Sequence, residues 1–378
     1  MSLMQSIKDS INGAFGAGTV MSMDDLPQEC TVIPTGVDVL DEALGIGGLP
    51  VGRIIELYGP EMSGKSTILL QACGKCQKVL ERPVLYLDYE NALDRTYAAR
   101  LGINMDSELF AFSQPEDLEQ GMDIAETYVQ QNAVGLIVID SLAAMMPRAE
   151  LYDKKGKERG FGDKSPMAAQ GAAMASALRR LTRQVSKSNV CLCFINQTRI
   201  DIKAAQRGFH KITTPGSRTL KFYASLRVEF KKRKGIKGKI KDSLTNEFID
   251  GSIASSIEAR VVKNKLAPPF TFCRFGLTFG QGVSNIMSNC LLAMERGVII
   301  KRGAGYYKVP VSAEHEPESV RGIESVFNFY KESDEANKYL YSLLFEKDKL
   351  TDEEDSDTNE KSSDNVVSDT DVEDLLDN

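Results

Sequence analysis

Residues 59–66, with the sequence GPEMSGKS, match the pattern G-x-x-x-x-G-K-[ST] at every fixed position. This pattern forms a loop whose backbone N–H groups hold nucleotide phosphates at the start of a helix. Lys65 would reach the β- and γ-phosphates, and the Ser66 hydroxyl is a suitable Mg²⁺ ligand. A chance glycine turn is the alternative, but an apolar segment at 53–58 precedes the loop and a helix-prone segment at 67–72 follows it. The sequence therefore predicts a site for ATP and Mg²⁺, with the loop residues Gly59, Pro60, Glu61, Met62, Ser63, Gly64, Lys65, Ser66 and Thr67.

Two acidic residues, Glu90 and Asp140, stand at or just beyond the ends of apolar segments at 84–88 and 136–140. Acids at the carboxyl ends of parallel strands open into the ligand crevice of an α/β sheet. Asp140 is predicted to organise Mg²⁺ together with Ser66, as the strand-end acid of phosphate-loop enzymes does. Glu90 could activate the attacking water as a general base, or it could merely cap the end of its strand.

The segments that must position these residues alternate between strand and helix patterns. Five apolar segments are predicted to be strands, at 53–58, 84–88, 109–113, 136–140 and 190–196. Helical stretches separate them, among them 119–131 and 167–186. This alternation predicts an α/β fold with a mostly parallel twisted sheet covered by helices on both faces. The sheet is then expected to be extended by antiparallel strands at 221–231, 256–265 and 271–279.

The charge of the chain is divided unevenly. Residues 351–378 contain twelve Asp and Glu and one Lys, a net charge of −11, whereas the whole chain carries −7 and the other 350 residues carry +4. Such an acidic segment cannot bury enough apolar surface to fold, so it is either a solubility device or an internal competitor for a basic surface.

From the patterns along the whole sequence, we expect a helical arm at 1–33, a nucleotide-binding core at 34–283, a small α+β domain at 284–345 and a disordered acidic tail at 346–378.

The composition argues against several other classes of protein. No apolar run approaches the ~20 residues of a membrane span, and the N-terminus has no continuous apolar signal segment. Seven cysteines, an odd number, argue against a disulfide framework. Cys73 and Cys76 are spaced like a redox pair or half a zinc site, but with only two histidines in the chain, reduced buried thiols are favoured. The expectation is a soluble, cytoplasmic protein without a membrane partner.

Seven separated blocks, spread over about residues 5–345, form a more specific pattern. They are GGLPVGRIIELYGPEMSGKST, LDYENALDRTYAARLGI, IVIDSLAAMMPRAE, FINQTRIDIK, TPGSRTLKFYASLR, VVKNKLAPPF and ERGVIIKRGAGYY. Together they resemble the bacterial RecA recombinase family. The resemblance implies a phosphate-loop NTPase core of the RecA type and DNA-stimulated ATP hydrolysis. It also implies helical filaments on single-stranded DNA, which pair with homologous double-stranded DNA and exchange strands in recombination, repair and the SOS response to DNA damage.

The resemblance further implies roles for individual residues near the nucleotide. Glu90 corresponds to the catalytic carboxylate. Asp94 and Tyr97 correspond to adenine contacts, with the tyrosine ring stacked on the base. Gln197 corresponds to a sensor of the γ-phosphate that leads into a DNA-binding loop. Binding of ATP could then order the loop, and hydrolysis could release it.

Two lysines of the VVKNK block, Lys263 and Lys265, correspond to a catalytic pair that reaches the ATP of the neighbouring subunit. Phe222 would lie at the same interface between subunits. Judged by spacing alone, the two lysines could equally be alternate residues on a solvated face of a strand. The interpretation from the family ties ATP hydrolysis to filament assembly.

Two basic, glycine-containing segments, 151–167 and 199–218, are predicted to bind DNA. Basic side chains pair with phosphates, and apolar side chains can insert between bases. By the resemblance, Met167 and Ile202 match inserting positions and Arg179 matches a phosphate contact. Ordinary solvated loops are the alternative interpretation. The predicted DNA-binding residues are Met167, Arg179, Arg199, Ile202, Lys203, Arg207, Lys211 and Arg218.

Several positions depart from the family pattern. The first basic segment is longer and more basic than in typical members, Ala172 stands in place of a usual arginine, and Glu258 stands where a basic residue is common. Ser217 replaces the second glycine of a Gly-Gly pair. These departures concern DNA contacts rather than the ATP site, and they are compatible with a divergent or phage-encoded member. A basic run at 231–234, together with Arg260, could form a second, weaker surface for duplex DNA.

Two other functions are compatible with a phosphate-loop core. A ring-forming helicase would load on single strands and unwind duplex, but the VVKNK block and the C-terminal module argue against it. A nucleotide-gated mediator would bind partners and barely hydrolyse ATP. The presence of Lys65, Glu90, Asp140 and Gln197 argues against such a loss of chemistry. A recombinase that is a DNA-dependent ATPase is the preferred interpretation.

Overall fold

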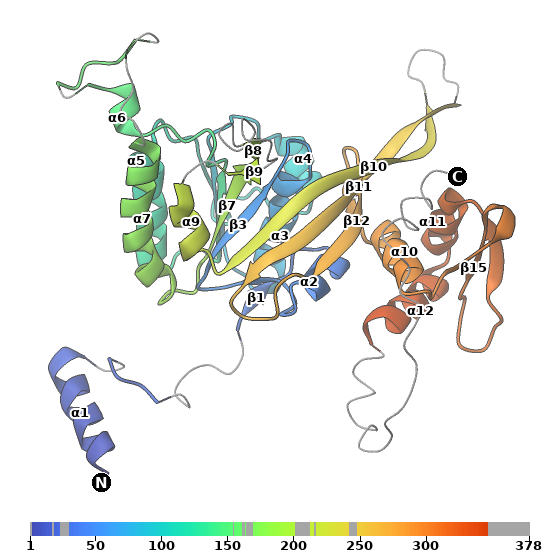
Figure 1. Ribbon diagram of the computed structural model, residues 1–378, viewed down its shortest axis with the longest axis horizontal. Coiled ribbons are helices and arrows are strands. Elements are labelled where there is room, and N and C mark those ends of the chain that lie inside the picture. The colour runs from blue at the N-terminus through green and yellow to red at the C-terminus, as the bar shows by residue number, and fades with distance from the viewer. Residues whose placement is uncertain are drawn as a thin grey trace, which may run out of the picture.

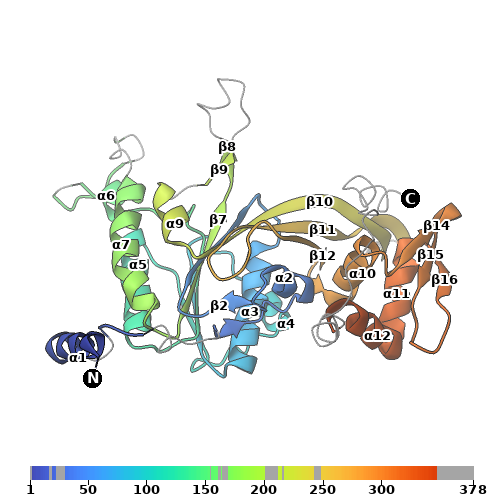
Figure 2. The same cartoon turned by 60° about the horizontal axis from the view of Figure 1, so that its bottom comes forward.

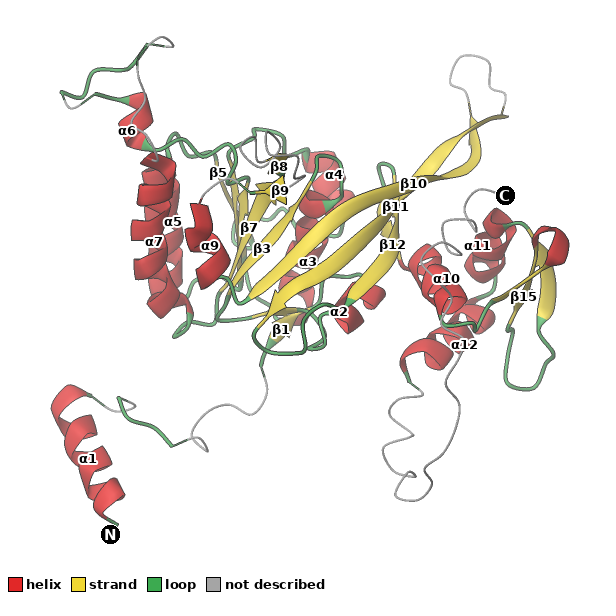
Figure 3. Cartoon of the chain, viewed as in Figure 1, coloured by secondary structure: helices red, strands yellow, loops and turns green. Residues whose placement is uncertain are grey.

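The computed structural model describes residues 2–16, 19–22, 30–153, 155–160, 163, 169–200, 212–214, 217–241 and 248–346. At its centre is a nine-stranded sheet in the order β13-β12-β11-β10-β3-β7-β6-β4-β5. Figure 1 shows the middle of this sheet, from β12 to β7. Helices lie over both faces of this sheet (Figure 3). The arrangement confirms the predicted α/β fold, with parallel pairing from β10 to β5 and antiparallel pairing from β10 to β13.

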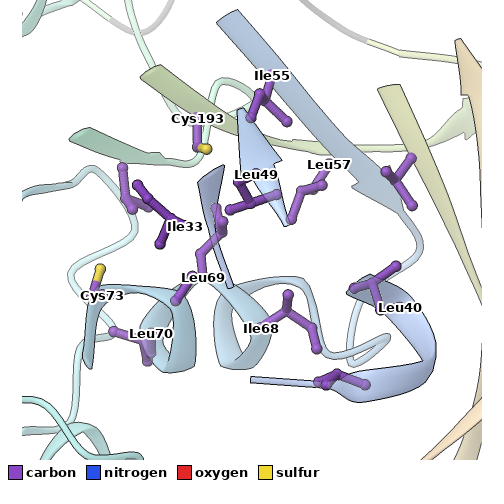
Figure 4. Packing of buried hydrophobic residues seen from close by; sticks show 14 of the residues in the cluster. Ile33, Leu40, Leu49, Ile55, Leu57, Ile68, Leu69, Leu70, Cys73 and Cys193 are labelled. Atoms are coloured by element: carbon purple, nitrogen blue, oxygen red, sulfur yellow. The ribbon is translucent and has the colours of Figure 1, made fainter. Parts of the chain in front are cut away.

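The parallel strands lie between layers of helices, and all but the edge strand β5 are buried along almost their whole length. They are β3 (Ile54–Gly59), β4 (Val84–Asp88), β5 (Phe110–Ser113), β6 (Leu136–Asp140) and β7 (Cys191–Gln197). Because successive side chains of a strand point to opposite faces, each strand supplies two cores. On one face, Ile55 and Leu57 share a core with Ile68 and Leu69 of α3 (Lys65–Val79) (Figure 4). On the other face, the core includes residues from α5 (Leu118–Gln130), α7 (Ala169–Val185) and α9 (Ser217–Tyr223).

Several short elements connect these layers. They are β1 (Val32–Ile33), α2 (Asp38–Ala43), β2 (Leu49–Pro50), α4 (Arg95–Arg100), α6 (Arg148–Leu151), β8 (Arg199–Ile200) and β9 (Ile212–Thr213). β1 pairs with β2, and β8 pairs with β9, in both cases antiparallel.

The antiparallel extension consists of β10 (Leu226–Lys241), β11 (Phe248–Asn264), β12 (Phe272–Thr278) and β13 (Gly282–Ser284). The prediction of a strand at 221–231 was wrong at its start, because residues 217–223 form α9 and Leu220 is buried in the core beside α7. The predicted strand also ended too early, because β10 continues to Lys241. Beyond residue 231, β10 is held by backbone pairing with β11 rather than by an apolar pattern that sequence would reveal.

A smaller module follows the sheet (Figure 2). Its elements are α10 (Asn285–Glu295), β14 (Ile300–Arg302), the 3₁₀ turn η2 (Gly303–Gly305), β15 (Tyr306–Val309), β16 (Glu318–Arg321), α11 (Ile323–Glu332) and α12 (Asp334–Phe345). The module has its own core, which includes Tyr307, Phe327 and Tyr330. Ile236 of β10 and Ala254 of β11 belong to this same core, so the long hairpin is packed into the module.

The first helix, α1 (Leu3–Phe15), lies away from the sheet and buries none of its residues (Figure 1). Leu3, Met4 and Phe15 are each 78% exposed. Six of the seven cysteines are buried and all are free, as expected for reduced thiols. Within the described residues, no helix combines the length and the apolar character needed to cross a membrane. Residues 347–378, all but the first residue of the predicted acidic tail, lie outside the described residues.

Candidate active site

The phosphate-binding loop follows β3 and leads directly into α3. A side chain at Gly59 would place a Cβ atom 2.4 Å from the backbone oxygen of Phe230, so glycine is required where β3 meets β10. Gly64 has a left-handed backbone with φ of 81° and is the N-cap of α3. Glycine adopts this conformation without the steric cost that other residues have. The start of α3, with its N–H groups and positive dipole end, therefore faces the loop, as an anion site requires.

Lys65 is the buried cation of this loop. Its Nζ donates to the carbonyl oxygens of Gly59 at 3.1 Å and Pro60 at 2.6 Å, and to Ser63 Oγ at 3.3 Å. Burial lowers the pKa of Lys65, while the nearby charges of Asp140 and Glu90 oppose that shift. A phosphate oxygen would be a stronger, charged acceptor than these carbonyl groups. The ammonium group is thus held where a phosphate could replace its present partners.

Asp140 at the end of β6 is surrounded by hydroxyl groups. Its Oδ2 accepts hydrogen bonds from Ser66 Oγ and from Tyr86 Oη, both at 2.7 Å. Burial raises the pKa of Asp140, the two hydroxyl bonds lower it, and the negative charges of Glu90 and Asp88 raise it. A carboxylate and a hydroxyl are the hard oxygen donors that Mg²⁺ prefers, and a cation here would relieve the repulsion between the acids. The predicted pair of Ser66 and Asp140 therefore fits a Mg²⁺ ion.

Glu90 lies just beyond β4 and faces the ends of the two next strands. Its Oε1 accepts a short hydrogen bond from Ser141 Oγ and one of 3.2 Å from Gln197 Nε2. Its backbone N–H donates to Asp88 Oδ1 at 3.1 Å, which fixes the turn after the strand. The side chain itself is exposed, so water can reach it. A carboxylate that is oriented by two donors and open to solvent can accept a proton from an attacking water.

The residues predicted to contact adenine lie at the start of α4. Asp94 caps this helix, since its Oδ1 accepts from the backbone N–H of Tyr97 at 2.6 Å. The hydroxyl of Tyr97 is hydrogen-bonded to Thr67 Oγ1 at 3.0 Å. The tyrosine ring is therefore tied to the first turn of α3, next to the phosphate-binding loop.

Comparison with known proteins places this arrangement in a family. A family model described as the RecA N-terminal domain matches residues 2–284. The Protein RecA of Xanthomonas campestris pv. campestris (strain B100) is 42% identical over 297 residues, which cover 78% of this chain and 81% of that protein. The chain belongs to the RecA family. The Protein RecA of Chloroherpeton thalassium is 42% identical over 79% of this chain and 78% of its own, and that of Heliobacterium modesticaldum is 40% identical over 80% and 82%.

Among solved structures, a crystal structure of the RadB recombinase is similar with a TM-score of 0.47 and 21% sequence identity. The match covers 67% of this chain and 98% of that chain. The resemblance to the RecA family stated from the sequence is thus confirmed by the family model and by the curated relatives.

Two catalytic lysines predicted from the RecA pattern lie apart from this site. Lys263 pairs in register with Arg227, which pairs with Glu56 near the beginning of β3, whereas the phosphate loop follows the end of that strand. The Nζ of Lys263 donates to the backbone oxygens of Lys221 at 2.7 Å and Phe222 at 3.0 Å, at the end of α9. Lys265 is exposed. Their assignment to a neighbour's ATP stays a prediction for a RecA-type filament.

Only part of the predicted DNA-binding set falls within the described residues. Arg179 is exposed on α7, and its Nε donates to the carbonyl oxygen of Ala175 at 3.2 Å. The backbones of Arg199 and Arg218 lie in β8 and α9. Outside the described residues are Met167, Ile202, Lys203, Arg207 and Lys211.

The departures from the RecA pattern also have structural outcomes. Ala172 is exposed on α7, and Ser217 begins α9. Glu258 is buried and pairs with Arg233 at 2.7 Å, and it also approaches Arg260 and Arg274. These arginines lower the pKa of Glu258, against the effect of burial. The unexpected acid is therefore part of an ion-pair cluster within the sheet.

Sequence reasoning missed two residues that hold the predicted site carboxylates Asp140 and Glu90. Tyr86 donates to Asp140, and Ser141 donates to Glu90. Ser141 directly follows the strand-end acid, so its position was visible in the sequence. Tyr86 points to the same face as Asp88 by strand alternation, but a tyrosine inside an apolar strand reads as a core residue.

Proposed function

We propose that this chain is an ATP-dependent DNA recombinase that forms helical filaments on single-stranded DNA and exchanges strands with homologous duplex. The observation that carries this proposal is the convergence of Glu90, Ser141 and Gln197 at three adjacent strand ends, beside Lys65 and the Ser66–Asp140 pair. Membership of the RecA family agrees with it.

The residues divide the work of hydrolysis. Bound ATP would supply the phosphoryl group, and Mg²⁺ held by Ser66 and Asp140 would neutralise charge on the phosphate oxygens. Lys65 and the N–H groups at the start of α3 bind the phosphates. Glu90 accepts a proton from the attacking water and is oriented by the Ser141 hydroxyl. Gln197, the last residue of β7, connects this carboxylate to β8 and the basic segment that follows.

Subunit assembly completes the proposal. The exposed apolar residues of α1 would pack on a neighbouring copy, and Phe222, which is 72% exposed, would lie at the same kind of interface. Lys263 and Lys265 would then approach the ATP of that neighbour. We further propose that the chain works in the cytoplasm and is divided into the arm, core, C-terminal domain and tail expected from its sequence.

The decisive experiment is ATP hydrolysis with and without single-stranded DNA, with the same samples viewed by electron microscopy. The proposal expects strong stimulation by DNA together with helical filaments, followed by strand exchange with homologous duplex. Closed rings would favour the helicase. Tight binding of ATP and DNA without turnover would favour the mediator, and either outcome would overturn the recombinase.

A further inference from the structure

A buried ion pair lies in the sheet outside the nucleotide site. Arg227 Nε of β10 and Glu56 Oε2 of β3 are 2.6 Å apart, and their side chains are 13% and 0% exposed. The guanidinium group also lies 4.7 Å from the centre of the Tyr58 ring. A buried carboxylate requires a partner, because leaving it unpaired in the interior is costly. The arginine is therefore a fixed neighbour of Glu56.

The second oxygen of Glu56 begins a chain of hydrogen bonds to the catalytic carboxylate. Glu56 Oε1 accepts from Asn196 Nδ2 at 2.9 Å, and Asn196 Oδ1 accepts from the backbone N–H of Gln197 at 3.0 Å. Gln197 Nε2 then donates to Glu90 at 3.2 Å. Asn196 is fully buried. Because its amide meets an acceptor on one side and a donor on the other, only one orientation of the amide satisfies both.

The other end of this hydrogen-bond network, at Arg227, reaches the strands that lead to Lys263 and Lys265. Arg227 is in register with Lys263, whose ammonium group holds the end of α9 next to Phe222. Burial lowers the pKa of Lys263, the charges of Lys265 and Arg227 lower it further, and Glu56 opposes them. A change in the position of Lys263 would therefore alter the electrostatic environment of the Arg227–Glu56 pair.

We propose that Glu56 and Arg227 are positioning residues, whose buried ion pair orients Asn196 and thereby sets Gln197 against Glu90. They touch no reacting atom and act through β7. The pair also provides a physical route from the β10–β11 end that carries Lys263 to the base that activates water. This inference rests on the proposed ATPase function, because its effect is measured as turnover.

The test is steady-state ATP hydrolysis by Glu56→Gln at saturating single-stranded DNA. The substitution preserves shape and an acceptor for Asn196 but removes the charge that fixes Arg227. The expected result is a loss of about tenfold in kcat with KM for ATP within about twofold, as for outer residues that orient a site. Unchanged kcat in a folded Glu56→Gln protein would overturn the proposal.

A matched control separates positioning from stability. Glu126 on α5 is also buried and is bound by Arg180 and Gln184, but it is not connected to Gln197 by any hydrogen bond among the described residues. Glu126→Gln makes the same chemical change and should leave kcat within about twofold of the parent. An equal loss in both variants would mean that destabilisation, not positioning, reduces turnover.

A double substitution gives the sharpest readout. In a Gln197→Ala background, Glu56→Gln should change kcat by less than about twofold, because its route to Glu90 is already broken. Fully additive losses would refute the route through Gln197.

If Glu56→Gln does not fold, Arg227→Lys takes its place with the same expected pattern. This variant keeps the charge but loses the fixed planar geometry of the guanidinium group. If single-stranded DNA does not stimulate ATP hydrolysis by the unsubstituted protein, the recombinase proposal is refuted. The ratio of DNA-free ATP hydrolysis rates between the unsubstituted protein and Glu56→Gln would still decide whether Glu56 positions the site.

Discussion

At the scale of single residues, the two carboxylates of the site differ in the groups that donate hydrogen bonds to them. Glu90 and Asp140 lie close enough for their charges to affect each other, yet they have different partners. Asp140 is buried and held by two hydroxyl groups, which suits a metal ligand. Glu90 is exposed and oriented by Ser141 and Gln197, which suits a base. The difference in environment, since both side chains are carboxylates, is what supports the two different proposed roles.

Replacing Glu90 with Gln should separate binding from turnover. The variant keeps the shape of the side chain but cannot accept a proton from water, so it should bind ATP and DNA and hydrolyse ATP at least about 100-fold more slowly. Long-lived filaments seen by electron microscopy would accompany the slow turnover. A variant with normal turnover would place the general base elsewhere.

Replacing Lys65 with Ala should abolish nucleotide-dependent function. The substitution removes the cation at the loop, and the remaining backbone N–H groups cannot replace its charge at the β- and γ-phosphates. Strand exchange and ATP binding are the measurements, with Lys75→Ala on the outer part of α3 as a control. Strand exchange that persists in the Lys65→Ala protein would contradict the phosphate-loop mechanism.

At the scale of elements, α2 is joined to the preceding segment by an acid with an altered pKa. Asp41 accepts from the backbone N–H of Thr35 at 2.9 and 3.1 Å, and burial raises its pKa to about 7 despite these bonds. The folded state thus binds this proton more tightly than the unfolded chain, whose Asp pKa is about 3.9. The stabilising contribution of the protonated acid is present below about pH 4 and is lost as pH rises through about 7.

The replacement of Asp41 by Asn should remove this pH dependence. Asn keeps an acceptor for Thr35 but does not titrate, so the free energy of unfolding should fall less between pH 5 and 8 than in the parent. Chemical denaturation at several pH values measures the difference. Asp123→Asn, which changes an exposed acid on α5, is the control, and identical slopes in Asp41→Asn and parent would contradict the assignment.

The elements differ in how well the sequence predicts them. The segment 136–140 was predicted with its final bounds, because a strand buried on both faces is apolar throughout. The start of β10 was not, since apolar residues of α9 and of a strand look alike over so few positions. The approach of Gln197 to Glu90 follows from the order β3-β7-β6-β4, and no local pattern in the chain encodes that order. Tertiary pairing, rather than local preference, decides these features.

At the scale of the whole molecule, the acidic tail opposes a mildly basic body. Deleting residues 351–378 changes the net charge from −7 to +4. The truncated protein should bind duplex DNA more tightly, and the difference should shrink at high salt, where charges are screened. Duplex affinity measured across a salt series is the test. A tail of the same length with Asn and Gln in place of its acids is the control, and unchanged affinity after deletion would reduce the tail to a solubility device.

In mechanical terms, the hairpin of β10 and β11 is a long paired ribbon that can bend at three places. Its two strands are paired from Leu226 and Asn264 as far as Lys241 and Phe248, and the register shifts between Arg227 and Val228, between Lys232 and Gly235, and between Ile236 and Lys237. Irregularities of this kind are where a ladder bends most easily. Two of these register shifts flank Ile236, whose side chain packs into the core of the C-terminal module. The third lies beside Arg227. A movement of the module should therefore bend the hairpin mainly at the two shifts beside Ile236, before it reaches the shift next to the buried ion pair.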